Sequence, residues 1–254
     1  IRLIRRIKHN GYDLAVDLLD NRSATSSILI RNCGASRRLG FDKENRGIYS
    51  HIVPRGDRQR EHIVERFARL LTAFGVDPEG IDLSLEYPLS DEEIVAAREK
   101  MGIKQAKLRI GINLAGSDRA KFWGTDNNVD FIKIISDKLD CEVRIFALPD
   151  YSAEVDEICR RSPATPAPAA GSVHEYAALL RTCDAIVTPD TAAVHFAAAW
   201  KIPALAMYNT AGQSFGGIPW YPWQSPHRAL TTSRPPLSNI PVAEAVAAFL
   251  ELGL

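Results

Sequence analysis

The chain has 254 residues, enough for one large domain or two ordinary ones. Hydrophobic residues make up 46% and charged residues 24%, a composition that excludes an intrinsically disordered chain. The 31 lysines and arginines balance the 31 aspartates and glutamates, which excludes an overall charge that would draw the whole protein to nucleic acid.

Cysteine spacing and hydropathy narrow the class of protein further. The four cysteines are far apart and form no CxxC pair, which disfavours zinc ligation and a disulfide framework and favours reduced thiols in a cytoplasmic protein. No apolar run approaches the roughly 18 residues of a membrane-spanning helix. The opening IRLIRRIKHN lacks the apolar core and cleavage site of a signal peptide.

That opening segment is predicted to form an amphipathic helix. Ile1, Ile4 and Ile7 recur at helical spacing among basic residues, and the helix is expected to end near Asn10-Gly11. Two interpretations stay open. The helix packs on a sheet with a solvated basic face, or the basic face binds anionic lipid or a phosphorylated acceptor at the inner membrane surface.

The next part of the chain alternates short strand and helix signals. Predicted strands or extended connections lie at 12–19, 36–42 and 49–55, and predicted helices at 26–34 and 60–76. Gly75 is expected to end the second of these helices. This first part begins in a helix and has few convincing core strands, as if its opening strand–helix units were missing.

Residues 77–93 are rich in proline, glycine and acid and are predicted to link two domains. Ser90 and Glu93 form a capping box for the following helix. Beyond it, predicted strands lie at 108–116, 141–149, 184–189 and 202–209, and predicted helices at 91–103, 128–139, 153–161, 173–183, 191–201 and 241–254. Repeated βαβ units of this kind predict an α/β fold with a parallel, doubly wound sheet.

Two loops of the second half carry residues suited to a phosphorylated ligand. In NLAGSDRAKFWG (113–124), Gly116 allows the backbone to come close to a ligand, Ser117 supplies a hydroxyl and Lys121 a mobile cation. The pattern is not a Walker A motif. The alternative interpretation is a surface turn with an exposed lysine.

The second loop is TPDTAAVHFAAA (188–199), where an apolar strand ends and a helix begins. Asp190 is interpreted either as a plain helix N-cap or as an acceptor for a sugar hydroxyl. Thr191 and His195 lie four residues apart on one helix face, next to a helix N-terminus that favours phosphate. No G-x-S-x-G or H-E-x-x-H motif is present, so neither a hydrolase triad nor a zinc protease site is expected.

An aromatic segment, GGIPWYPW (216–223), follows the last predicted strand. It is interpreted either as a packed loop or as a platform for a sugar or a base. The histidines other than His195 are scattered and are expected to lie on the surface or in loops.

Taken together, these blocks resemble glycosyltransferase family 9, the ADP-heptose:lipopolysaccharide heptosyltransferases and their relatives. The resemblance rests on Gly116-Ser117 followed by Lys121-Phe122-Trp123, and on Asp190-Thr191-Ala192-Ala193-Val194-His195 followed by an alanine-rich helix and Pro203. YDLAVDLLDNRSATSSIL and RRLGFD are also similar to the family's N-terminal domain. The resemblance spans nearly the whole chain.

The resemblance implies a GT-B-like fold of two Rossmann-like domains, the N-terminal one incomplete. The implied domains are 1–88 on the acceptor side and 89–239 for the nucleotide-sugar donor, with a helix at 240–254 that packs back on the first domain. The implied reaction is inverting transfer from an ADP-heptose-like donor to a lipopolysaccharide core or other surface glycan, with no cofactor and no obligatory metal.

In the implied site, Ser117, Lys121 and the backbone at Thr191-Ala192 neutralise the leaving diphosphate, while Asp190 and His195 orient the donor. Ala192 stands where the family usually has glycine. Asp150 and Glu154 are the candidates for contact with the donor nucleoside. The family's general base is an aspartate expected upstream of Ile1, so no catalytic residue is assigned. The alternative is a sugar-nucleotide-binding homologue without that base.

Overall fold

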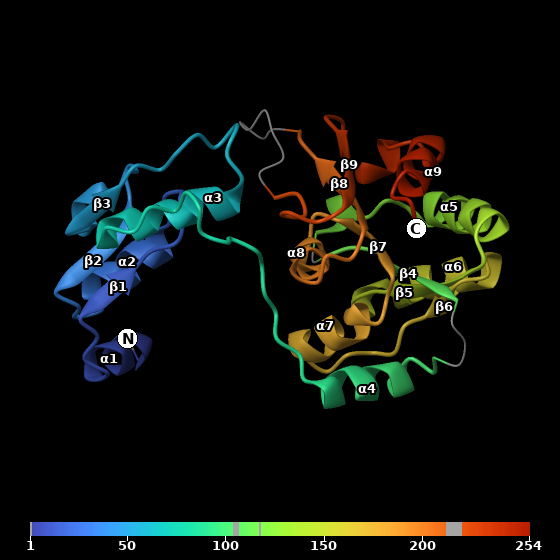
Figure 1. The fold of residues 1–254 in the computed structure, drawn as a ribbon, viewed down its shortest axis with the longest axis horizontal. Coiled ribbons are helices and arrows are strands. Elements are labelled where there is room, and N and C mark those ends of the chain that lie inside the picture. The colour runs from blue at the N-terminus through green and yellow to red at the C-terminus, as the bar shows by residue number, and fades with distance from the viewer. Residues whose placement is uncertain (1, 104–106, 117, 212–219) are drawn as a thin grey trace. The chain divides into compact units, whose positions relative to one another are not determined.

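The computed structural model describes residues 2–103, 107–116, 118–211 and 220–254. Within them the chain divides into two compact units, with the boundary between Leu83 and Ser84. This boundary lies inside the segment predicted to be a linker, a few residues before the predicted domain end at 88. The two units are described separately below (Figure 1).

The N-terminal unit contains a parallel sheet of β1 (Leu14–Val16), β2 (Arg37–Phe41) and β3 (His51–Val53), in that order. Its helices are α1 (Arg2–His9), α2 (Ala24–Asn32) and α3 (Ile63–Ala68), and α3 continues as a 3-10 helix through Phe74. Gly75, at φ 72°, ends that helix as predicted. The core is small and consists of Leu39, Phe41, Val53 and Leu70.

The amphipathic helix α1 packs beside α2 rather than on the sheet. Ile4 and Ile7 are half-buried, and none of the described residues of α1 is fully buried. The prediction of a packed amphipathic helix is therefore confirmed, but the prediction that it lies on a sheet is wrong.

A buried polar network closes the carboxyl end of β1. The Asp17 carboxylate accepts hydrogen bonds from Lys43 Nζ at 3.0 Å, Tyr49 Oη at 2.6 Å and Ser26 Oγ at 2.5 Å. Burial by itself would raise the pKa of Asp17, but these three donors hold it below its ordinary value. Gly40 makes room for the ring of Tyr49, because a Cβ there would lie 2.5 Å from it.

A second ion pair holds the loop that follows β1. Arg66, on the buried face of α3, pairs with Asp20, and Arg58 Nε lies 3.4 Å from the same carboxylate. Together with the Asp17 network, it joins residues 17–22 to elements far along the chain, so buried charges supplement the small apolar core.

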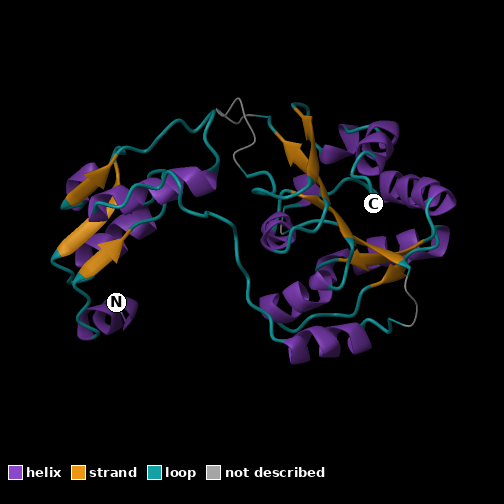
Figure 2. Ribbon diagram, in the orientation of Figure 1, coloured by secondary structure: helices purple, strands orange, loops and turns teal. Residues whose placement is uncertain are grey.

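The C-terminal unit is built on a six-stranded parallel sheet in the order β6-β5-β4-β7-β8-β9, which confirms the predicted doubly wound α/β class (Figure 2). The strands are β4 (Leu108–Asn113), β5 (Cys141–Phe146), β6 (Thr165–Pro166), β7 (Ala185–Pro189), β8 (Ala204–Asn209) and β9 (His227–Thr232). The edge strands β6 and β9 are the two that no periodic pattern predicts.

Helices cover both faces of this sheet. They are α4 (Asp91–Lys100), α5 (Thr125–Lys138), α6 (Ser152–Arg161), α7 (Val173–Arg181), α8 (Ala192–Ala199) and α9 (Val242–Leu250). One apolar core gathers residues of α5, α6 and α9, and the other gathers residues of α4, α7 and α8. The strand residues alternate between these cores, as Val187 faces the first and Ile186 the second. The capping box of Ser90 and Glu93 forms as predicted.

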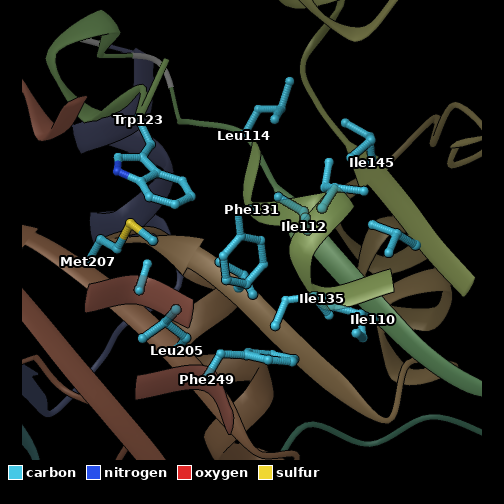
Figure 3. Packing of buried hydrophobic residues seen from close by; sticks show 14 of the residues in the cluster. Ile110, Ile112, Leu114, Trp123, Phe131, Ile135, Ile145, Leu205, Met207 and Phe249 are labelled. Carbon is cyan, nitrogen blue, oxygen red and sulfur yellow. The ribbon is translucent and has the colours of Figure 1, made fainter. Parts of the chain in front are cut away.

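The last helix packs in the C-terminal unit. Phe249 of α9 lies 5.6 Å from Phe131 of α5, ring centre to ring centre, and Phe131 in turn contacts Trp123 (Figure 3). The closing helix belongs to the second unit, because its buried apolar face completes the core of that unit.

The four cysteines are free thiols, as expected. Across the described ranges, no helix has both the length and the apolar character needed to cross a membrane.

Candidate functional site

The two predicted loops lie at the carboxyl ends of adjacent strands. Strands β4 and β7 pair in parallel, from Ile110 with Ala185 to Ile112 with Val187. They are also the point where the strand order reverses, which is where open α/β sheets bind ligands. A small, half-open cavity of about 10 Å³ lies between these strand ends. It has room for about one water molecule.

Lys121 joins the two loops. Its Nζ donates to the carbonyl oxygen of Asp190 at 2.7 Å and to the Asp190 carboxylate at 2.9 Å. The side chains remain 33% and 29% exposed, so both charges face solvent as well as each other. Lys121 is therefore not a fully exposed lysine, because its ammonium is paired with the second loop. A cation is held over the start of α8.

Trp123 anchors the loop that carries Lys121. The indole is buried, and its Nε1 donates to the carbonyl oxygen of Ile240 at 2.9 Å. The Lys-x-Trp pattern thus combines two functions, because the tryptophan fixes the loop to the core while the lysine remains at the surface.

The prediction that Asp190 caps α8 is wrong, because Thr191 is the N-cap. Thr191 has extended backbone angles, and its Oγ1 accepts from the amide of Ala193. Asn113, at the end of β4, donates from Nδ2 to Oγ1 of Thr188 at 3.1 Å and of Thr191 at 3.0 Å. The backbone amide of Asp190 donates to the carbonyl oxygen of Met207 and so extends the pairing of β7 with β8. The side chain of Asp190 pairs with Lys121 instead of capping the helix.

The assignment of Thr191 as the N-cap of α8 can be tested by measuring the free energy of unfolding of variants. Replacing Thr191 with Ala is expected to lower the free energy of unfolding by about 1 kcal/mol, because the Ala193 amide and Asn113 each lose a partner. Urea denaturation of Thr191→Ala and Asp190→Ala compares the two residues. A larger loss for Asp190→Ala would contradict the assignment.

The remaining predicted phosphate-binding residues lie around this cap. A Cβ added to Gly116 would lie 3.4 Å from Cγ2 of Thr191, so the first loop approaches the second closely at the glycine. Ala192 is the first residue of α8 and is exposed. The first amides of a helix have no partner within it and favour an anion. Ser117 lies outside the described residues.

His195 lies one turn into α8, on the side of β8. Burial lowers the pKa of His195, and the charge of Asp190 opposes this shift. A neutral imidazole is therefore favoured at pH 7. Its ring is 6.0 Å from that of Trp220, and Tyr208 Oη donates to the Trp220 carbonyl at 3.2 Å.

The two candidates for nucleoside contact lie on the other side, after β5. Glu154 forms an ion pair with Arg119. The hydrogen bond from Arg119 lowers the pKa of Glu154. The carbonyl of Asp150 accepts from Arg119 Nη2 at 2.9 Å, while its carboxylate is exposed. The Arg119 guanidinium also stacks on Tyr151, 4.3 Å from the ring centre.

The structure thus brings together Gly116, Lys121, Asp190, Thr191, Ala192 and His195, and places Asp150 and Glu154 beside the same loop through Arg119. Sequence reasoning missed Asn113, Thr188 and Arg119. Asn113 and Thr188 lie near the carboxyl ends of β4 and β7. The only sequence signal for a role in the site was a polar residue at the end of an apolar strand. Arg119 gave none, because one arginine in a polar loop is unremarkable.

These features define a doubly wound α/β fold in which two polar loops and the start of α8 meet at the topological switch point. Residues 1–238 match the family model of glycosyltransferase family 9 (heptosyltransferase), so the chain belongs to that family. The family predicted from the motifs is confirmed.

Individual relatives are distant. Lipopolysaccharide heptosyltransferase 3 of Escherichia coli K12 is 24% identical over 237 residues, which cover 88% of this chain and 65% of the relative. The chain therefore spans somewhat less than two thirds of that relative's length.

Solved structures match the fold over nearly the whole chain. A family 9 glycosyltransferase from Veillonella parvula has a TM-score of 0.77 at 19% identity, covering 99% of this chain and 76% of that one. The E. coli ADP-heptose lipopolysaccharide heptosyltransferase II has a TM-score of 0.73 at 19% identity, covering 99% and 79%. An E. coli heptosyltransferase solved with ADP has a TM-score of 0.72 at 16% identity, covering 100% and 76%. The predicted GT-B-like fold is confirmed.

Proposed function

We propose that the protein transfers a sugar from a nucleoside diphosphate sugar of the ADP-heptose type to a lipopolysaccharide core or another surface glycan, with inversion. The observation that carries the proposal is the convergence of Gly116, Lys121 and the N-terminus of α8 at the ends of two adjacent strands. It is supported by the names of the relatives, which include a lipopolysaccharide heptosyltransferase and enzymes solved with ADP and with ADP-2-deoxy-2-fluoro heptose.

The chemistry follows from the charge of the leaving group. As the bond to the sugar breaks, negative charge develops on the diphosphate, and donors already aimed at that position stabilise the transition state. Lys121 and the first amides of α8 would supply this stabilisation, so the proposal includes neither a cofactor nor an obligatory metal. Asp190 and His195 would orient the donor. No residue of this chain is assigned as the general base.

The proposal places the reaction in the cytoplasm, at the inner membrane surface where a glycolipid acceptor would lie. The unburied basic side chains of α1, Arg2, Arg5, Arg6 and Lys8, suit contact with anionic headgroups or a phosphorylated acceptor.

Calorimetric titration with ADP, ADP-heptose and UDP-glucose tests the proposal. The two ADP compounds are expected to bind, and absence of binding by all three would refute it. Incubation of ADP-heptose with a lipopolysaccharide acceptor then separates an enzyme from a binding homologue. Release of ADP with transfer of the sugar supports the enzyme, whereas binding without turnover supports the homologue.

A further inference from the structure

The described part of the aromatic segment after β8 separates into two kinds of residue. Trp223 is buried, and Tyr221 stacks on His227 at 5.3 Å between ring centres. Trp220, in contrast, is 38% exposed. Trp223 therefore packs in the fold, as the packed-loop interpretation predicts, while the ring of Trp220 remains partly exposed.

The backbone of Trp220 is held close to the donor site. Its carbonyl accepts the hydrogen bond from Tyr208 at the end of β8, and its ring contacts His195 at an interplanar angle of 66°. Asp190 is near enough to Tyr208 for its charge to contribute to the raised pKa of that phenol, of which burial is the larger cause. Trp220 thus shares one side of the site with Asp190 and His195.

The indole N–H of Trp220 differs from those of Trp123, which is buried, and Trp200, which is partly buried. Trp123 donates to the carbonyl of Ile240, and Trp200 donates to the carbonyl of Tyr87. Within residues 2–103, 107–116, 118–211 and 220–254, the structure gives the Trp220 Nε1 no acceptor. Trp220 therefore presents a partly exposed apolar ring and an indole N–H with no acceptor among the described residues, the two features that make tryptophan effective at binding surfaces.

The strand order places β5 and β8 on opposite sides of the central strands β4 and β7. The diphosphate groups would lie at the ends of β4 and β7, with β5 on one side and β8 on the other. The β5 side carries Arg119, whose guanidinium lies over the buried ring of Tyr151, and Glu154. The β8 side carries a neutral imidazole and a partly exposed indole, and the Asp190 carboxylate lies at the end of the neighbouring β7. These groups suit a ligand with many hydroxyls and an apolar C–H face.

We propose that Trp220 is a specificity-determining residue that packs against the sugar of the donor, with Asp190 and His195 beside it, while the nucleoside lies on the β5 side. This inference rests on the proposed function. The proposed contact is with the transferred sugar rather than with the nucleotide. Loss of the contact should therefore weaken binding of the nucleotide sugar and leave binding of the nucleotide alone nearly unchanged.

Titration of ADP and ADP-heptose into the wild-type protein, Trp220→Ala and Trp220→Phe tests the inference. Trp220→Ala is expected to weaken ADP-heptose binding about three- to tenfold and to change ADP binding less than about twofold. Trp220→Phe should retain most of the affinity, because a ring remains. Trp200→Phe, at the far end of α8, is the matched control and should change neither affinity.

Three outcomes would overturn the inference. Equal weakening of ADP and ADP-heptose by Trp220→Ala would place Trp220 against the nucleotide or in a structural role, and a lowered melting temperature of this variant would indicate the latter. No change for either ligand would remove Trp220 from the site. Failure of the wild-type protein to bind either ligand is the separate result that refutes the proposed function and this inference with it.

Discussion

Replacing Lys43 with Met is expected to lower the free energy of unfolding of the protein by about 3 to 5 kcal/mol. The Lys43 side chain is fully buried, and that of Asp17 is 3% exposed, so the ammonium is the charge that neutralises this carboxylate. Lys43 Nζ also donates to the carbonyls of Leu19 and Asn21. Its removal leaves a buried charge and two carbonyls without this partner. Urea denaturation, followed by circular dichroism, measures the loss.

Two further variants make this prediction specific. Lys107 forms an exposed pair with Asp140 at 2.8 Å, so Lys107→Met should cost less than about 1 kcal/mol. Adding Asp17→Asn to Lys43→Met should recover part of the loss, since the unpaired charge is gone. A loss for Lys43→Met as small as that for Lys107→Met would contradict the role assigned to the network.

Replacing Lys121 with Ala is expected to weaken ADP binding by about 2 to 3 kcal/mol, or roughly 30- to 150-fold. The substitution removes the cation that would face the diphosphate. It also leaves the carboxylate of Asp190, its present partner at 2.9 Å, to repel the same ligand. Calorimetric titration of the two proteins with ADP measures the difference.

Asp190→Asn is expected to have the opposite effect on ADP. Its carboxylate competes with the diphosphate for Lys121, so its neutralisation should tighten ADP binding a few-fold, and in a Lys121→Ala background it should recover part of the lost affinity because the unpaired carboxylate no longer repels the ligand. Lys133, on the outer face of α5 and exposed, provides a control in Lys133→Ala, which should bind ADP like the wild-type protein. Unchanged ADP affinity in Lys121→Ala would exclude the assigned site.

The elements with strong local signals were predicted well. The helices α4, α5, α7, α8 and α9 and the strands β4, β5, β7 and β8 lie within the predicted ranges or within a few residues of them, because their patterns are determined by burial on one or both faces. β6 and β9 were missed. β6 is a two-residue, proline-containing edge strand, and β9 mixes polar with apolar residues because an edge is only partly buried.

The sequence by itself determined the class of fold, the family and the two loops that carry the site, since each depends on residues close together in the chain. The tertiary structure alone decided which residues meet. Lys121 and Asp190 are 69 positions apart, and Asn113 and Thr191 are 78 apart. They touch only because β4 and β7 are neighbours at the centre of the sheet.

The same distinction explains the corrected assignments. Asp190 and Thr191 are both good N-cap residues by type, and the choice between them depended on the bond from Asn113 and on Lys121 engaging the aspartate. The buried Asp17–Lys43 pair connects residues 26 positions apart and has no local pattern. Local periodicity specifies elements, whereas strand order and packing specify the contacts between them, and only those contacts make a site.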